Sequence, residues 1–157
     1  MDRRKLAKLL VGFAVSMAAS GAQGQAVRIS GLSDLDFGMI TDVAPDRTLG
    51  ESICAFSGLL GGRYSVTASG SGAGGAFTLA NGAATLPYEV QWSTTAGRTS
   101  GTNLAPGVAL TGQTMLLSCP VLQTANASLI VILRSGSLSV ATAGDYSGTL
   151  TIILSAS

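Results

Sequence analysis

The strongest constraint on the fold is a regular alternation near the end of the chain, from Asp145 to Ala156. One face of this run carries Tyr146, Gly148, Leu150, Ile152 and Leu154, and the other carries Ser147, Thr149, Thr151 and Ser155. A period of two with apolar residues on one side predicts a β-strand with one buried face. Only three residues follow Leu154, so we expect its second partner strand to come from an earlier segment or from another molecule.

The remaining sequence also favours strands. After residue 30 no segment keeps a 3.6-residue period, and short apolar or β-branched runs alternate with clusters of Gly, Ser, Thr and Asn. The expected strands are 27–29, 35–40, 52–57, 63–69, 76–80, 86–92, 108–117, 129–133 and the final run. Seven to nine short strands predict an all-β fold, an immunoglobulin-like antiparallel sandwich, in a single domain over residues 27–157.

Several strands have a recognisable internal pattern. In the expected strand 35–40, Leu35 and Phe37 point one way, and the flanking Asp34 and the internal Asp36 point the other. Residues 86–92 place Leu86, Tyr88, Val90 and Trp92 on one face, with Pro87 at an edge or at the start of the strand. Residues 129–133 are apolar on both faces, which indicates a central strand. The glycine-rich stretch 70–75 predicts a hairpin between its neighbouring strands, and Asn81-Gly82 predicts a turn. Residues 42–50 and 135–144 are expected to be connections.

Residues 1–26 are expected to be a cleaved signal peptide. A basic stretch precedes a short apolar segment, Leu9 to Ala19, and small residues follow it, so cleavage after Gly24 or after Ala26 fits. The apolar segment is too short to span a bilayer by itself, and a short membrane anchor is the alternative. We therefore expect a secreted protein.

The charge of the remaining chain excludes several classes of partner. Both lysines lie in the leader, and five arginines and seven carboxylates remain, so the formal net charge falls from +1 to about −2. Without a basic stripe or a polybasic patch, we expect no binding to nucleic acid and no membrane insertion after signal cleavage.

The two cysteines, Cys54 and Cys119, are interpreted as a disulfide, because an even number of cysteines behind a secretory signal is typical of an oxidising compartment. A bridge that closes so long a loop stabilises by roughly 4 kcal/mol on the chain-entropy model. Two free buried thiols are the alternative.

The residues offer little catalytic chemistry. The absence of histidine removes the commonest general base and most zinc sites. Residues 70–75 match the dinucleotide spacing Gly-x-Gly-x-x-Gly, but the sequence after them predicts a strand instead of the helix that holds phosphate. Asp34 and Asp36 suit a glycosidase pair only if a groove brings them to a sugar. Asp42 and Asp46 lack a third carboxylate for calcium. We expect no enzyme, and no catalytic, cofactor or metal site.

The aromatic residues leave a second functional hypothesis open. Tyr64, Tyr88, Trp92 and Tyr146 could line a sugar platform, although their alternation with polar residues favours burial. On this alternative the protein is a secreted binding module for a carbohydrate or surface ligand, and it folds as a self-complete monomer. Asn126-Ala127-Ser128 is a glycosylation sequon, which we discount because we interpret the protein as bacterial.

Four sequence segments, in order, resemble one known family. The segments are Ile29-Ser30-Gly31-Leu32-Ser33-Asp34-Leu35-Asp36-Phe37-Gly38, Gly62-Arg63-Tyr64-Ser65-Val66-Thr67-Ala68-Ser69-Gly70, Leu86-Pro87-Tyr88-Glu89-Val90-Gln91-Trp92 and Ala143-Gly144-Asp145-Tyr146-Ser147-Gly148-Thr149-Leu150-Thr151-Ile152. In order and character they are similar to the spore coat protein U-like domain of archaic chaperone–usher pilus subunits. The resemblance covers nearly all of the chain after the leader.

The resemblance implies a sandwich that lacks its last strand and is completed by another chain. A periplasmic chaperone would fill the vacancy first, and the N-terminal arm of a neighbouring pilus subunit would replace it at an outer-membrane usher. The implied groove residues are Leu35, Phe37, Tyr146, Leu150, Ile152 and Leu154. The function implied is that of a non-enzymatic subunit of a cell-surface fimbria, with a role in adhesion.

The candidate donor arm is short. Only about Gln25 to Ser33 precedes the first core strand, with Val27, Ile29 and Leu32 as apolar plugs. Relatives of this type usually carry a longer arm and often a cysteine near the mature N-terminus. A tip or terminating subunit that accepts a donor strand is therefore a further possibility, as is a secreted relative that closes its own sheet.

Overall fold

The computed structural model describes residues 27–58, 61–115 and 125–157, and the expected signal peptide lies outside them. The elements in these ranges are β1 (Val27–Ser30), β2 (Arg47–Ser57), β3 (Arg63–Gly70), a 3-10 turn (Ala73–Gly75), β4 (Thr78–Asn81), β5 (Ala84–Pro87), β6 (Glu89–Ser93), β7 (Thr102–Leu104), β8 (Leu110–Thr114), β9 (Ala127–Leu133), α1 (Ser135–Val140) and β10 (Leu150–Ala156). The strands pair antiparallel and helix is scarce, so the predicted all-β sandwich is confirmed.

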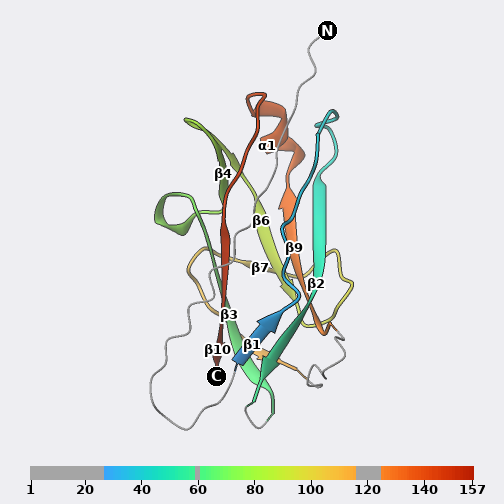
Figure 1. Ribbon diagram of the computed structural model, residues 1–157, viewed down its shortest axis with the longest axis vertical. Helices are drawn as coiled ribbons and strands as arrows, with labels where there is room; N and C mark the ends of the chain where they lie inside the picture. The colour runs from blue at the N-terminus through green and yellow to red at the C-terminus, as the bar shows by residue number, and fades with distance from the viewer. Residues whose placement is uncertain (1–26, 59–60, 116–124) are drawn as a thin grey trace.

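The strands form three sheets. A five-stranded sheet has the order β1-β2-β9-β6-β7, a three-stranded sheet has the order β10-β3-β8, and β4 and β5 form a separate hairpin. In the view of Figure 1, β10 and β3 lie along one side of the molecule, β2 and β9 along the other, and β6 between them. The inner faces of the sheets share one hydrophobic core.

Strand β9 is at the centre of the large sheet. It pairs with β2 on one edge and with β6 on the other, and all seven of its residues are buried. The prediction of a central strand over 129–133 is confirmed. Its neighbour in sequence, Asn126, extends the ladder with its side chain: Ala55 N donates to Asn126 Oδ1 at 2.9 Å, and Asn126 Nδ2 donates to Ala55 O at 2.8 Å. The sequon asparagine is thus engaged in the fold.

The run 86–92 is divided between two sheets. Its predicted inward residues Leu86, Tyr88, Val90 and Trp92 are all buried, as expected. The prediction of one continuous strand is wrong, because β5 pairs with β4 whereas β6 pairs with β9. The change occurs at Tyr88, whose backbone N–H donates to Phe77 O at 3.0 Å. Pro87 has no N–H to donate, so it ends β5.

The glycine-rich stretch does not form the predicted hairpin. Strand β4 pairs with β5 instead of β3, although Gly72 N donates to Ala76 O at 3.1 Å and reverses the chain locally. A Cβ on Gly70 would lie 2.2 Å from the same carbonyl oxygen, so the close approach needs glycine. The predicted turn at Asn81-Gly82 is confirmed: it joins β4 to β5, and Gly82 has a φ of 58°.

Two of the expected connections contain regular structure. Strand β2 begins at Arg47, inside the loop expected over 42–50. Helix α1 lies in the connection expected over 135–144 and was not foreseen. Ser135 N at its start donates to Asp46 Oδ1 at 2.7 Å, which satisfies one of the unpaired amides of the helix.

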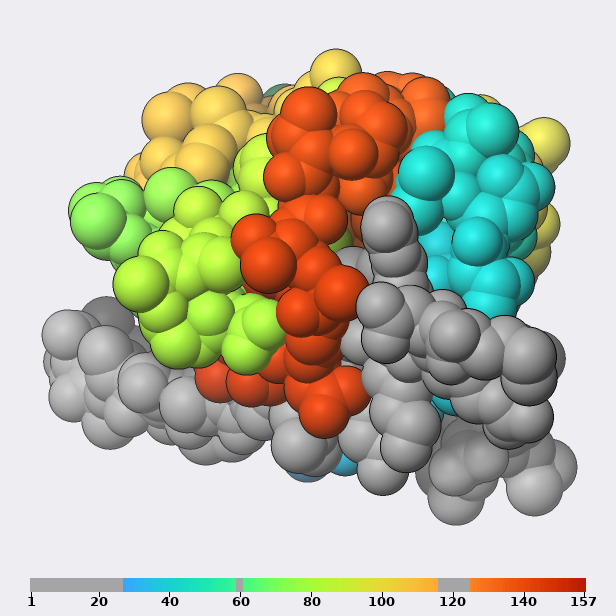
Figure 2. Space-filling view, turned by 90° about the horizontal axis from the view of Figure 1, so that it is seen from above, coloured from blue at the N-terminus to red at the C-terminus, as the bar shows by residue number. Residues whose placement is uncertain are grey.

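Arg134 joins three elements at this end of the molecule. Its Nη1 lies 2.8 Å from Asp46 Oδ2, ahead of β2, and its Nε lies 2.9 Å from Glu89 Oε1, at the start of β6. Figure 2 shows the result from above: the orange-red residues around α1 lie between the cyan residues that lead into β2 and the light-green β4–β5 hairpin. The bidentate contact with Glu89 fixes the guanidinium plane as well as its charge.

This cluster predicts a dependence of stability on acid pH. The hydrogen bond from the Ser135 amide, followed by that from Arg134, lowers the pKa of Asp46, and the hydrogen bond from Arg134 lowers the pKa of Glu89. Carboxylates with a lowered folded-state pKa stabilise above their unfolded pKa, and this stabilisation is lost as the pH falls below about 4. We expect Asp46→Asn to flatten the fall of the melting temperature between pH 5 and pH 2, measured by calorimetry at about unit steps of pH. The exposed Asp34→Asn is the control, and superimposable wild-type and Asp46→Asn curves would contradict the assignment.

Candidate functional site at the edge of β10

Strand β10 has the alternation that its sequence predicts. Leu150 and Ile152 are 1% and 5% exposed, whereas Ile153 on the opposite face is 42% exposed. All seven residues pair with β3, from Leu150 opposite Gly70 to Ala156 opposite Tyr64. The strand is shorter than expected, because the residues before it take another partner: Ser147 exchanges two backbone hydrogen bonds with Ala80, of 2.8 and 3.0 Å.

The second edge of β10 has no hydrogen-bonded partner strand in the described residues. No ladder and no backbone hydrogen bond from residues 27–58, 61–115 or 125–157 reaches β10 other than those of β3. Strand β1 comes close enough to contact β10 but pairs only with β2. In Figure 1 the blue β1 lies beside the C-terminal part of β10. A seven-residue strand with one unpaired edge is a template for strand addition.

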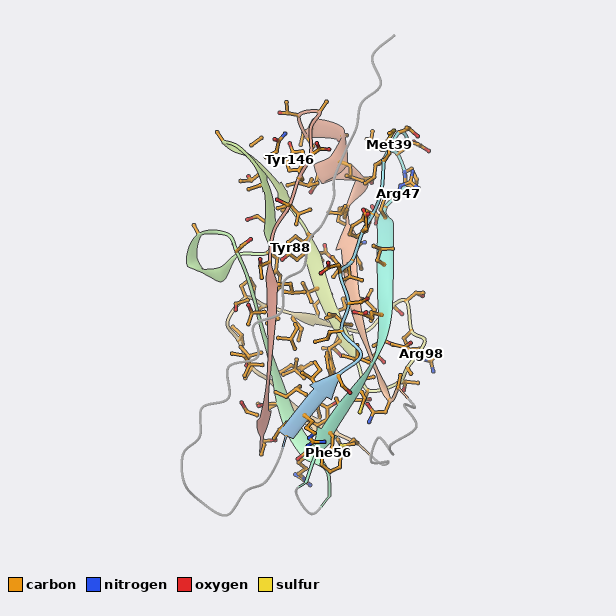
Figure 3. All side chains as sticks on the ribbon, viewed as in Figure 1. Met39, Arg47, Phe56, Tyr88, Arg98 and Tyr146 are labelled. Atoms are coloured by element: carbon orange, nitrogen blue, oxygen red, sulfur yellow. The ribbon has the colours of Figure 1, made fainter. Side chains whose placement is uncertain are left out.

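The six predicted groove residues belong to one apolar cluster. Leu35, Tyr146, Leu150 and Ile152 are buried in the core, and Phe37 and Leu154 are partly buried against it. Figure 3 shows Tyr146 at the end of the molecule where α1 lies. Tyr146 is fully buried, and its hydroxyl donates to Thr142 O at 3.0 Å, four residues earlier in the chain. The side chains on the inner face of β10 thus pack in the hydrophobic core of this chain.

The predicted strand over 35–40 does not form, which corrects the sequence interpretation. Asp36 Oδ1 accepts a hydrogen bond of 2.8 Å from Gly38 N, and Gly38 has a φ of 64°, so the chain turns there. The expected sidedness is nevertheless present: Leu35 is buried, whereas Asp34 and Asp36 are exposed. The segment therefore supplies an apolar side chain to the core without a ladder of its own.

The candidate donor arm is part of the large sheet. Val27 and Ile29 lie in β1, opposite Ser57 and Ala55 of β2, and Ile29 and Leu32 pack against the core. An arm that is paired in its own domain is not available to a neighbour. A donor role for these residues would require β1 to leave β2.

One cysteine of the predicted bridge is described. Cys54 is disulfide-bonded, in the part of β2 that pairs with Ser30 of β1. Cys119 lies outside the described residues, so its pairing with Cys54 stays a prediction.

The aromatic residues are core side chains. Trp92 and Tyr64 are each 1% exposed, and Trp92 Nε1 donates to the Tyr64 hydroxyl at 3.3 Å in an edge-to-face pair. Tyr88 stacks on Phe77 with ring centroids 5.6 Å apart, and burial raises the pKa of Tyr88 to about 12. With Tyr146 also buried, these four rings present no surface to a sugar, as their alternation with polar residues favoured.

Two of the four acidic candidates, Asp36 and Asp42, accept hydrogen bonds in local turns, and Asp46 binds Arg134 and Ser135. Asp36 accepts from Gly38 N, as described above, and Asp42 Oδ1 accepts from Ala44 N at 3.0 Å. Within the described ranges, no three His, Cys, Asp or Glu side chains gather so as to hold a metal ion. The glycine-rich stretch leads through a three-residue 3-10 turn into β4, so it presents no helix of the kind that holds phosphate.

Two charged residues on β2 were missed because the strand was expected to begin at residue 52. Arg47 and Glu51 lie directly opposite the core leucines Leu133 and Leu129 of β9, so they point to the inner face of the sheet. The signal in the sequence is the alternation of Arg47, Leu49, Glu51 and Ile53, which a strand beginning at Arg47 would have revealed.

Comparisons with known proteins add no relative. No family model, no curated protein and no solved structure matches the chain. None of the described helices is long and apolar enough to cross a membrane.

Proposed function

We propose that this protein is a structural subunit of a secreted surface fibre, assembled by strand addition along the unpaired edge of β10. The observation that carries the proposal is that β10 pairs with β3 on one edge and with no described strand on the other. The partner is an extended segment of another chain, first of a periplasmic chaperone and then of a neighbouring subunit at an outer-membrane usher. The proposed role is mechanical and non-enzymatic.

The composition of β10 supports this role. Proteins usually protect a free edge with charged residues, proline or a bulge. Residues 146–157 contain no charged side chain and no proline, and the register of β10 with β3 is uninterrupted over seven pairs. An incoming strand would therefore find a regular row of backbone groups, with Leu150 and Ile152 facing the core beside it.

The surroundings of Tyr146 support an immunoglobulin-like sandwich. In such sandwiches a tyrosine near the start of the sixth strand hydrogen-bonds the backbone a few residues upstream. Tyr146 precedes β10 and donates to Thr142 O in the same manner. With β10 in the place of that strand, the missing neighbour corresponds to the seventh and last strand, as the resemblance to the spore coat protein U-like domain implies.

The position of β1 favours an accepting subunit over one that both accepts and donates. Val27 and Ile29 are engaged with β2, so the described residues leave no arm free for a neighbour. We therefore propose a place at the tip or at a terminus of the fibre. The leader-like residues 1–26 support secretion through the periplasm, and display at the cell surface is part of the proposal.

Hydrogen exchange of the β10 amides tests the proposal. In an antiparallel ladder, successive residues direct their N–H groups to opposite edges. In the isolated protein we expect every second amide of Leu150–Ala156 to be protected by β3 and the intervening amides to exchange at least about a hundredfold faster. Addition of a neighbouring subunit or a donor peptide is expected to protect the second set. Equal protection of both sets in the isolated monomer would contradict an open edge.

A further inference from the structure

Besides β10, an unpaired edge runs along the first half of β2. Strand β1 pairs only with Cys54–Ser57, so β2 from Arg47 to Ile53 has β9 on one side alone. From the described residues no backbone hydrogen bond reaches the other side of this stretch. The chain leaves the ladder at Gly31, whose φ is 84°. In the described residues, β2 from Arg47 to Ile53 and β10 are thus two of the stretches at which a strand could be added.

The two edges differ in charge. Arg47 and Glu51 point to the inner face of β2, and Arg47 Nε and Glu51 Oε2 are shielded from solvent without a hydrogen-bond partner. Leu49, between them, packs against the core. Strand β10 has no charged residue at all. Inward-pointing charges are one of the devices by which proteins prevent strand addition at an edge.

Both charges also hold the segment 31–46 in place. Glu51 Oε1 accepts a hydrogen bond from the Ser33 hydroxyl, and Arg47 Nη2 donates to Asp42 O at 2.7 Å. Between these two contacts the segment buries Leu35 and Ile40. The segment is therefore attached to β2 through the side chains of Arg47 and Glu51 and through the core. No backbone–backbone hydrogen bond joins it to β2.

We propose that Arg47 and Glu51 are specificity residues that prevent strand addition at β2 and so direct the incoming strand to β10. A strand that paired with β2 would have to displace segment 31–46. It would break the contacts of both residues and leave a guanidinium and a carboxylate beneath its own apolar side chains. Addition at β10 breaks no such charged contact, because β10 contains no charged residue. The inference deepens the proposed function and, in its directing part, rests on it.

The test compares two double variants of the purified protein. Arg47→Met with Glu51→Met keeps unbranched side chains and removes both charges from the inner face of β2. Arg63→Met with Asp34→Met likewise removes one positive and one negative charge and adds two methionines, at two exposed positions. Self-association is measured by sedimentation equilibrium, and hydrogen exchange with mass spectrometry reports on peptides covering β2 and β10.

For the β2 variant we expect at least about tenfold tighter self-association, with new, concentration-dependent protection of residues 47–53. The surface control should behave as the wild type. Unchanged association, or new protection confined to 150–156, would overturn the proposal. If the double variant melts below the assay temperature, the two single variants are measured in the same way. New protection of residues 47–53 in either one would support the proposal, and its absence in both would overturn it.

The same data separate this inference from the proposed function. If wild-type assemblies leave the second amide set of β10 unprotected, the proposed function fails. New protection at 47–53 in the β2 variant would still establish that the two charges guard that edge. If β10 is protected in assemblies and the β2 variant gains nothing, the proposed function stands and the role of Arg47 and Glu51 is refuted.

Discussion

Ile152→Asp is expected to destabilise the isolated protein strongly, whereas Ile153→Asp should change its stability little. The two residues are adjacent in β10, but Ile152 is 5% exposed in the core and Ile153 is 42% exposed on the opposite face. A carboxylate at position 152 loses the burial of the isoleucine and is itself buried without a partner, a cost of about 4 kcal/mol or more. The outward substitution should cost about 1 kcal/mol or less.

Urea unfolding of both variants measures this difference directly. Because small domains are stable by only about 5–15 kcal/mol, the inward variant should lose a large part of its stability and unfold at a much lower urea concentration. The outward variant should unfold at nearly the wild-type urea concentration. Similar stability of the two variants would show that the inner face of β10 is not where the structure places it.

Tyr146→Ala is expected to have the second largest effect. Tyr146 is fully buried and its ring belongs to the main core, so removal of the ring should cost about 3–5 kcal/mol. Tyr146→Phe keeps the ring and removes only the hydrogen bond to Thr142 O, and it should cost about 1 kcal/mol. The ratio of the two losses of stability separates the contribution of ring packing from that of the hydrogen bond to Thr142 O.

Chemical unfolding monitored by the fluorescence of Trp92 suits this pair, because Trp92 is buried in the same core. Val140→Ala is a near-neutral control, since Val140 is 82% exposed in α1. If Tyr146→Phe were as destabilising as Tyr146→Ala, the hydroxyl would carry the stability and the interpretation through ring burial would be wrong.

The sequence predicts best those elements whose pattern of apolar and polar residues follows from burial alone, whichever strand they pair with. Strand β10 alternates and β9 is apolar on both faces, and both patterns follow from burial alone. The turn at Asn81-Gly82 is equally local, because glycine at Gly82 accepts a positive φ. The unpaired edge of β10 was foreseen as one of two possibilities from the same pattern.

The elements that were mispredicted depend on contacts distant in sequence. Residues 35–40 alternate like a strand but have no ladder partner, and a turn held by Asp36 interrupts them. The run 86–92 changes sheets because Phe77 O accepts from Tyr88 N, which no periodicity reveals. The inward direction of Arg47 and Glu51 contradicts the usual polar-out pattern, so only the register with β9 identified it.

The pairing of β10 with β3 also has a kinetic consequence. Residue 150 pairs with residue 70, so the three-stranded sheet closes over a long stretch of chain and only after β10 has been synthesised. Until then β3 has β8 alone as its neighbour, and the core beneath it is incomplete. Folding should therefore be slow compared with that of helical domains of the same size, and the late intermediate should be the species most prone to aggregate.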